Sequence, residues 1–434
     1  MPARQRWFLL ALSAVIALAS HVVFIRFLPA PWQRNESADY RVFYEPVARQ
    51  LAAGRGFHLA SGKPALKYPP GMPIVLGATF WLSDQTGLRH ETGVTVLQGL
   101  LMIASGVLVA ALALQFYGAR VALLACVLWS TYPFHLWLTK QASSGLLACV
   151  LLLSGTFAFV RWSVSGRAAL CWGVTCGMVL GFAALTKPFN IVLPAVFLAL
   201  AWICSVPCTL RKRTVFSLSV LMAFVLSISP WEVWAWRVSG QCIPLCTNGP
   251  ASVADGLTFG ACRKRVGSRQ GLPRKVAALT DDLSAHRDDL RSSAGITRLL
   301  WAKLREEPIK VARLFLTKAV QSWYSTDSRT HEHWTVLIQL SYLPLFVLGA
   351  RLAWLRDRQQ KNFLMIALGV TLYYWAMTTF AALAIVRYLV PAIGLLMVLA
   401  GDAADALLSA ACWRVSLVRR ESLPNCPPAD FSEL

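Results

Sequence analysis

Acidic residues, and charged residues of any kind, are scarce in this sequence. Only 15% of the 434 residues are charged, and 21 Asp and Glu stand against 42 Lys and Arg, whereas 56% of the residues are hydrophobic. A soluble chain of this length could not expose so apolar a surface to water, so the composition excludes a soluble globular protein. The mean hydropathy of +0.53 indicates a polytopic membrane protein.

The basic excess would suggest a nucleic-acid partner in a soluble protein. Here much of it lies in short loops and at the ends of apolar runs, where membrane orientation places Lys and Arg. We therefore expect the membrane, anionic lipid head groups and phosphates as partners, and no nucleic acid.

Metal-binding spacing is also missing from the cysteines, most of which lie within apolar runs. Cys242, Cys246 and Cys262 share one polar segment, where a disulfide between two of them is the alternative to isolated thiols. The triplet His331 to His333 sets two imidazoles beside a carboxylate, but polar residues before a span explain it equally well. No cofactor is required by the sequence, and no motif indicates a divalent cation.

Ten apolar runs are long enough to cross a membrane as helices. They lie near residues 7–28, 92–117, 120–138, 145–163, 168–186, 189–205, 215–231, 334–355, 363–384 and 388–411. The first run is expected to be an uncleaved anchor, because it is too long for a signal peptide and lacks a small-residue cleavage site. The run 69–82 is too short to span and is expected to lie in or dip into the interface.

The short basic loops predict the topology. They are Arg4 with Arg6, Arg120, Arg161 with Arg167, Arg211 to Arg213, Arg351 to Lys361, and Trp413 to Arg420. With ten spans, and with 69–82 excluded, all of these loops fall on one side, which the positive-inside rule makes the cytoplasm. We therefore expect a multi-pass protein of the plasma or inner membrane with both termini in the cytoplasm.

The same count places the isolated polar features together on the extracytoplasmic face. They are the insert 29–91, the turn Thr139–Ser144, Lys187, the segment 232–333 and Arg387. A candidate site is therefore expected on that face, at the membrane surface.

The expected fold is an all-α polytopic membrane protein with about ten transmembrane helices. Residues 1–231 form an N-terminal transmembrane catalytic core, whose external loop 29–91 carries juxtamembrane helices. Residues 232–333 form an external segment between the seventh and eighth spans, with amphipathic helices from about Gly271 to Leu316 lying against the membrane. Residues 334–434 form the C-terminal transmembrane helices and a short cytoplasmic tail.

Asp39 is the first candidate for chemistry, because a carboxylate near the membrane plane can accept a proton from a hydroxyl group. It precedes an expected helix from Tyr40 to Ala52, so helix capping is the alternative interpretation. Glu36 and Glu45 are the other carboxylates nearby, and Glu45, inside the helix, is expected to be structural.

Three basic residues are candidates for holding a phosphate at the same face. Lys187 lies at the join of two apolar runs and Arg387 just before the last run, and Lys140 is a third candidate. The alternatives are that Lys187 snorkels to the surface, that Arg387 anchors the interface, and that Lys140 ends a span.

Five motifs, taken in order, resemble those of the GT-C glycosyltransferases, in particular the protein O-mannosyltransferase and aminoarabinose-transferase branch. Asp39, with Gly54 fifteen residues later, resembles the first-loop motif of that superfamily. The other matching stretches are Tyr68-Pro69-Pro70-Gly71-Met72-Pro73, Gly181 to Pro188, Pro230-Trp231 with Gly240 and Thr247-Asn248-Gly249, and Arg387-Tyr388-Leu389-Val390-Pro391. Together they cover nearly the whole chain.

This resemblance implies an inverting transfer of a sugar from a polyprenyl-phosphate donor to a hydroxyl acceptor on a protein, lipid or glycan, at the extracytoplasmic face. It implies that Asp39 is the general base, and that Lys187 and Arg387, with Lys140, bind the donor phosphate. The residues expected beside the substrates are Glu36, Tyr40, Tyr68, Pro70, Ser144 and Tyr388.

One departure from the family pattern keeps alternatives open. Members usually carry a second acidic residue at the turn after the third span, and the matching position here is Ser144. A non-catalytic membrane scaffold derived from such an enzyme is therefore one alternative. A lipid or sugar transporter is another, although charges deep within the spans, which a transporter needs, are few.

Overall fold

The computed structural model describes residues 2–29, 37–204, 206–263, 271–329 and 332–421. Within these ranges the chain is helical, apart from turns and one isolated bridge between His58 and Pro64. The all-α fold expected from the sequence is thereby confirmed.

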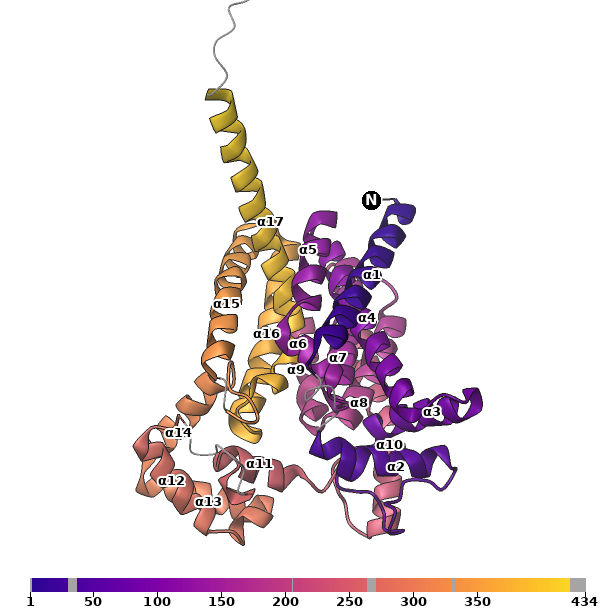
Figure 1. Ribbon diagram of the computed structural model, residues 1–434, viewed down its shortest axis with the longest axis vertical. Helices are drawn as coiled ribbons and strands as arrows, with labels where there is room; N and C mark the ends of the chain where they lie inside the picture. The colour runs from indigo at the N-terminus through magenta and orange to yellow at the C-terminus, as the bar shows by residue number, and fades with distance from the viewer. Residues whose placement is uncertain (1, 30–36, 205, 264–270, 330–331, 422–434) are drawn as a thin grey trace, which may run out of the picture.

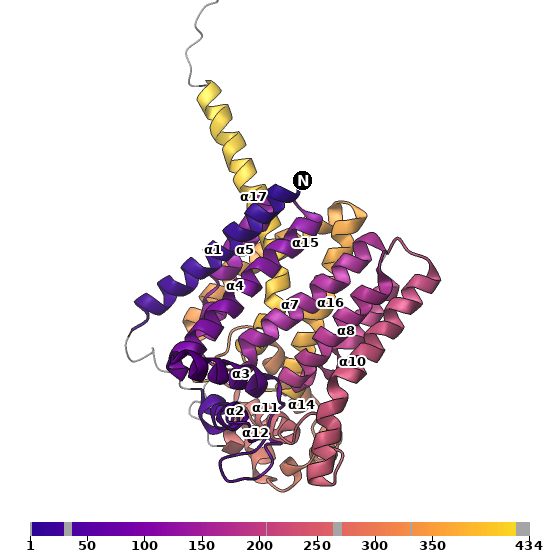
Figure 2. The same ribbon diagram turned by 90° about the vertical axis from the view of Figure 1, so that its right-hand side faces the viewer.

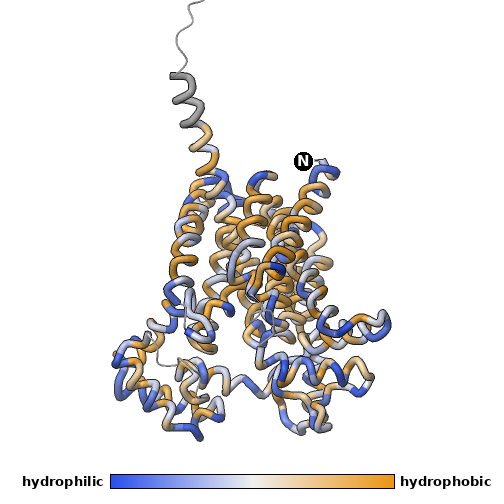
Figure 3. The backbone as a smooth tube through the Cα atoms, viewed as in Figure 1, coloured by the Kyte–Doolittle hydropathy of each residue, from blue (hydrophilic) through white to orange (hydrophobic). Residues whose placement is uncertain are grey.

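Among the described residues, eight helices are long and apolar enough to cross a membrane. They are α1 (Ala3–Phe27), α4 (His90–Phe116), α7 (Ser144–Ser165), α8 (Ala169–Thr186), α10 (Leu210–Ser239), α15 (Glu332–Leu355), α16 (Arg358–Ala381) and α17 (Val390–Glu421). They run side by side as a bundle (Figure 1), and the apolar residues concentrate in that bundle (Figure 3). The protein is an integral, multi-pass membrane protein.

The expected span 120–138 is not one straight helix. It breaks into α5 (Ala119–Ser130) and α6 (Pro133–Lys140), which are bent by 54° relative to each other. The break follows from Pro133, because a residue before proline avoids the helical region, and Tyr132 is extended. Taken as one broken span, the pair raises the number of candidate spans among the described residues to nine.

The expected span 189–205 is also shorter than a spanning helix. It begins with a 3-10 turn, η3 (Pro188–Val192), and continues as α9 (Leu193–Ile203). The two pieces together form an apolar helix below spanning length.

The first external loop folds into short helices across one end of the bundle. They are the π-helical turn η2 (Tyr40–Tyr44), α2 (Glu45–Ala52) and α3 (Gly71–Thr86). α3 includes residues 71–82 of the run 69–82, is not among the candidate spans, and lies across the direction of the bundle (Figure 1). Its buried Met72, Leu76 and Phe80 form a small core with α2.

The segment between α10 and α15 forms a helical layer at the same end of the bundle as α2 and α3 (Figure 1). Its helices are α11 (Gly249–Leu257), α12 (Arg274–Ala285), α13 (Ser293–Glu306) and α14 (Pro308–Gln321). They enclose their own core around Leu257, Leu279 and Leu314. α1 begins, and α17 ends, at the opposite end of the bundle.

Helix α8, which carries Lys187 at its end, packs tightly against α10, and the two run side by side in Figure 2. Gly173, Gly177 and Gly181 repeat every fourth residue along this contact. A Cβ atom on Gly177 would lie 2.3 Å from the carbonyl oxygen of Val220, so only glycine permits this approach. The stripe holds the end of α8 in a fixed position.

Candidate active site

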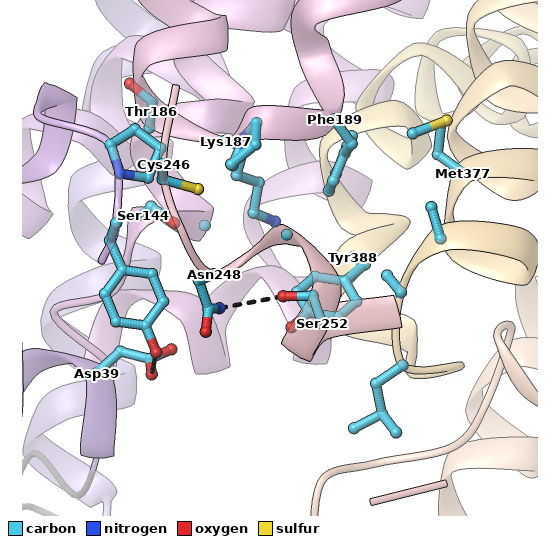
Figure 4. Close-up of a pocket in the computed structure, with 18 of the residues that line it drawn as sticks. Asp39, Ser144, Thr186, Lys187, Phe189, Cys246, Asn248, Ser252, Met377 and Tyr388 are labelled. Carbon is cyan, nitrogen blue, oxygen red and sulfur yellow. Dashed lines mark hydrogen bonds between the residues drawn. The ribbon is translucent and has the colours of Figure 1, made fainter. Parts of the chain in front are cut away.

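A cavity of about 390 Å³ lies where the bundle meets the first loop and the external layer. This volume is typical of small-molecule sites. Its ionisable lining includes Asp39, Lys187, Asp255 and Arg387, which come from four separate parts of the chain. Figure 4 shows Asp39 and Tyr388 on opposite sides of the cavity, with the Lys187 side chain extending between them.

Asp39 does not cap the helix that it precedes. Its backbone is already helical, and its side chain makes no capping hydrogen bond. Its carboxylate accepts a hydrogen bond from the Tyr68 hydroxyl, with 2.7 Å between the oxygen atoms. The capping interpretation is therefore wrong, and the carboxylate is oriented toward the cavity by a residue 29 positions along the chain.

Tyr68 belongs to an aromatic cluster with Phe43 and Tyr44, whose ring centroids lie 5.0 and 5.6 Å from its own. Burial and the neighbouring Asp39 carboxylate raise the pKa of Tyr44, against the effect of a hydrogen bond to Ser144. Asp39, Tyr44 and Ser144 are thus neighbours. Ser144, where the family pattern has its second acid, lines the same cavity.

Lys187 is extended because Pro188 follows it, and α8 therefore ends at Thr186. Its ammonium lies 4.8 Å from the centre of the Tyr388 ring and 5.4 Å from that of Phe189. Burial lowers the pKa of Lys187 to about 7, and the positive Arg387 adds to this effect. A bound anion would raise the pKa of Lys187 again by stabilising its charged form, so the group suits an anionic ligand.

Contacts on two sides hold the turn from Lys187 to Asn190, the Lys187 turn, in place. Tyr374 of α16 donates its hydroxyl to the side-chain oxygen of Asn190 at 2.9 Å, and the Asn190 amide donates to the Ala183 carbonyl at 3.0 Å. On the other side, a Cβ atom on Gly71 would lie 2.5 Å from the Thr186 hydroxyl oxygen. The Pro-Pro-Gly motif therefore ends in glycine because the start of α3 rests directly on the end of α8.

Arg387 lies in the 3-10 turn η6 (Val386–Tyr388), between α16 and α17. Its guanidinium Nη2 is 3.2 Å from the Asp327 carboxylate, and its Nε is buried without a hydrogen-bond partner among the described residues. Although burial disfavours the charged form, Asp327, Tyr388 and Asp39 raise the pKa of Arg387. Arg387 therefore presents a permanent charge to the cavity.

The other expected site residues are distributed as follows. Tyr68, Ser144 and Tyr388 line the cavity. Lys140, Tyr40 and Pro70 are not part of its lining, and the Lys140 ammonium lies 4.7 Å from the centre of the Trp137 ring. Glu36 lies outside the described residues. Glu45 forms an ion pair with Arg49 at 2.7 Å, in line with the structural role expected for it.

Several residues on the external side of the cavity are not among the site residues predicted from the sequence. Asp255 on α11 is a buried second carboxylate in the lining, and its Oδ1 accepts from the Cys262 thiol at 3.3 Å. Asn248 donates to the Ser252 hydroxyl at 3.1 Å (Figure 4). Cys246 also lines the cavity. Only the tertiary packing of α11 brings these residues to Asp39.

The structure does not support the alternative sites considered for cysteine and histidine. Cys242, Cys246 and Cys262 are free thiols. His331 lies outside the described residues, whereas Glu332 accepts a hydrogen bond from Ser325 and pairs with Arg329. Across the described ranges, no group of three or more His, Cys, Asp or Glu side chains is placed to hold a metal ion.

Comparison with known proteins adds independent observations. The family model described as dolichyl-phosphate-mannose-protein mannosyltransferase matches residues 69–234. The archaeal oligosaccharyltransferase AglB from Archaeoglobus fulgidus, in complex with an inhibitory peptide and a dolichol-phosphate, matches with a TM-score of 0.57 and 12% identity. The match covers 97% of this chain and 52% of that one. The apo form of the Archaeoglobus enzyme matches with a TM-score of 0.59 and 10% identity, over 96% and 52% of the two chains.

The chain has the GT-C fold. It spans about half the length of the archaeal oligosaccharyltransferase that it matches. ArnT from Cupriavidus metallidurans bound to undecaprenyl phosphate is matched with a TM-score of 0.44 and 14% identity, over 98% of this chain and 82% of that one. Among curated proteins, none matches this sequence.

Proposed function

We propose that this protein transfers a sugar from a polyprenyl-phosphate donor to a hydroxyl acceptor at the extracytoplasmic membrane surface. One observation carries the proposal: a single cavity is lined by a carboxylate, Asp39, and by two cations, Lys187 and Arg387. Base and cations are the two requirements of transfer from a phosphate leaving group. The GT-C fold and the mannosyltransferase family match support the same chemistry.

In the proposed reaction the acceptor oxygen attacks the anomeric carbon while Asp39 removes the hydroxyl proton. The new bond joins the acceptor oxygen to the anomeric carbon, and the bond from that carbon to the phosphate oxygen breaks. Because attack and departure occur on opposite faces, the anomeric configuration is inverted. The Tyr68 hydroxyl holds the Asp39 carboxylate in place through its 2.7 Å hydrogen bond.

The leaving group is polyprenyl phosphate, which gains negative charge as the bond breaks. Lys187 and Arg387 would hold its oxygens, because fixed cations stabilise such a developing charge strongly. The planar guanidinium of Arg387 can bind two phosphate oxygens at once. Lys140 is not part of the cavity lining, so we assign it no role in donor binding.

The extracytoplasmic placement rests on charge. Helices α5 and α10 begin at the end of the bundle away from the cavity (Figure 2), and their first turns carry the basic residues Arg120 and Arg211 to Arg213. The positive-inside rule assigns that end to the cytoplasm. A protease accessibility experiment on sealed, oriented membranes tests this, because the segment 232–333 should be cut from outside only.

The decisive experiment is sugar transfer in proteoliposomes with labelled polyprenyl-phosphate sugars. Asp39→Asn should lower turnover by about 100-fold or more and leave donor binding intact, because the amide cannot accept the proton. Asp288→Asn is the matched control, since Asp288 is a surface residue paired with Arg291. Full turnover by Asp39→Asn would refute the role of Asp39.

The scaffold alternative has its own outcome in this assay. Ser144 lines the cavity where the family pattern has an acid. Tight donor binding without turnover by the wild type, over a broad panel of donors and acceptors, would favour a non-catalytic scaffold. Restored turnover in Ser144→Glu would then locate the lost function.

A further inference from the structure

Helix α14 has two apolar faces, although it belongs to the external layer. Its inner face buries Val311 and Leu314. Its outer face exposes Ile309, Leu316 and Val320, with 69%, 65% and 55% of each residue accessible. These positions follow i, i+7 and i+11 spacing, so they form one stripe along the helix. A helix surrounded by water on its outer side would carry polar residues there.

The outer stripe continues the lipid-facing surface of α16. Met365, Leu368, Leu372 and Phe380 are exposed along α16, one of the candidate spans. The rings of Phe380 and Phe315 on α14 lie with centroids 5.0 Å apart. The backbone of α14 is held there as well, because the Trp375 indole donates to the Ala319 carbonyl at 2.8 Å. The stripe on α14 thus begins where the lipid surface of α16 ends.

The charges on α14 suit an anionic surface. The helix contains no acidic residue, and Arg313 lies on the outer face between Ile309 and Leu316. Lys310, on the first turn of the helix, is half exposed and pairs with Glu307. Basic residues that border an apolar stripe are typical of helices that lie in the plane of a membrane with anionic lipids.

We infer that α14 lies in the membrane interface, with Ile309, Leu316 and Val320 among the acyl chains and Arg313 at anionic phospholipid head groups. This surface is separate from the cavity and does not depend on the transfer reaction. It would attach the external layer to the bilayer at a second place, away from the first loop.

Photo-crosslinking in nanodiscs tests this inference. The intact protein would carry benzoylphenylalanine at position 316 or 320, in a phosphatidylcholine bilayer with a minor fraction of phosphatidylglycerol. We expect phospholipid adducts by mass spectrometry at a yield close to that of a probe at Leu372 on α16. A probe at Asp288, whose side chain is 93% exposed, serves as the aqueous control.

The adduct mass also reports the head group. Phosphatidylglycerol should be enriched over its share of the bilayer, and Arg313→Gln should lower this enrichment by about fivefold, the effect of one basic residue at an anionic surface. Arg298→Gln on α13 is the matched control. Adduct yields at 316 and 320 no higher than at 288, or crosslinks to a second copy of the chain, would overturn the lipid contact. Unenriched phosphatidylglycerol would overturn the anionic preference.

Discussion

Tyr68 donates its hydroxyl to the carboxylate of Asp39, across 29 positions of sequence. A hydrogen bond to a charged acceptor contributes roughly 1.5–3 kcal/mol. Tyr68→Phe keeps the ring packed against Phe43 and removes the donor, so we expect turnover to fall about 10-fold with little change in thermal stability. Tyr40→Phe, the same change outside the cavity, is the control. Unchanged turnover in Tyr68→Phe would show that Asp39 is oriented by other contacts.

Donor affinity should depend on pH through Lys187. Its pKa of about 7 in the empty cavity means that the ammonium loses its proton as pH rises through neutrality, and the attraction for phosphate is lost with it. We expect the Kd for an intact polyprenyl-phosphate sugar to rise between about pH 6 and pH 8. That donor is a phosphodiester and does not titrate in this range. Lys187→Arg, which stays charged, should flatten the profile, and a flat profile in the wild type would contradict the assignment.

Asp327 should compete with the donor for Arg387. Its carboxylate lies 3.2 Å from the guanidinium that would hold the phosphate. Asp327→Asn removes this competition, so we expect donor affinity to rise several-fold in a binding titration. Asp288→Asn, which also removes one surface carboxylate, should leave affinity unchanged. A weaker affinity in Asp327→Asn would mean that Asp327 orients Arg387 rather than competing for it.

Gly71 should not tolerate a side chain. The added methyl group of Gly71→Ala would lie 2.5 Å from the Thr186 hydroxyl oxygen and 2.7 Å from the Leu185 carbonyl oxygen. Overpacking of this kind costs about 1–3 kcal/mol, and the strain falls directly on the Lys187 turn. We expect lower thermal stability and weaker donor binding together. Gly118→Ala, where nothing lies within 4 Å, is the control and should change neither.

Replacing Lys318 on α14 should have the opposite effect to Gly71→Ala and stabilise the protein. It is fully buried, and its ammonium has no hydrogen-bond partner among the described residues. Burial lowers its pKa from 10.5 to about 7. The unfolded chain therefore binds the proton more tightly, so the destabilisation is complete below about pH 7 and fades as pH rises toward 10.

Lys318→Met should accordingly raise the thermal midpoint by several degrees at pH 7. The advantage over the wild type should shrink as pH increases, when melting is followed from pH 7 to pH 10. An advantage that does not change with pH would show that packing, and not the buried charge, accounts for the stabilisation.

Much of the architecture could be predicted because the membrane imposes it. Long apolar runs must be helical, since the bilayer core offers no partner for free backbone groups. The loop charges placed 69–82 outside the spans, and α3 indeed lies across the bundle. Hydropathy did not predict the break at Pro133 or the short length of α9, because the apolar content of a segment does not show whether its helix is continuous.

The candidate site could be predicted only from its membrane side. Asp39, Lys187 and Arg387 each stand out as a charge at the edge of an apolar run, and the structure places all three in one cavity. Asp255 lies in a polar segment where carboxylates are ordinary, and Asn248 belongs to the Thr247-Asn248-Gly249 motif, but neither was predicted to line the site. Tyr68 was predicted to lie beside the substrates and does line the cavity, but its hydrogen bond to Asp39 depends on the fold of the first loop.

The thiol of Cys246 lies in the cavity wall. Burial raises the pKa of this thiol, so alkylation should be slow and should follow access to the cavity. Peptide mapping separates it from the exposed Cys171, Cys242 and Cys412. In the unmodified protein, the rate at which Cys246 is alkylated therefore reports whether a ligand fills the cavity, even when no product is formed.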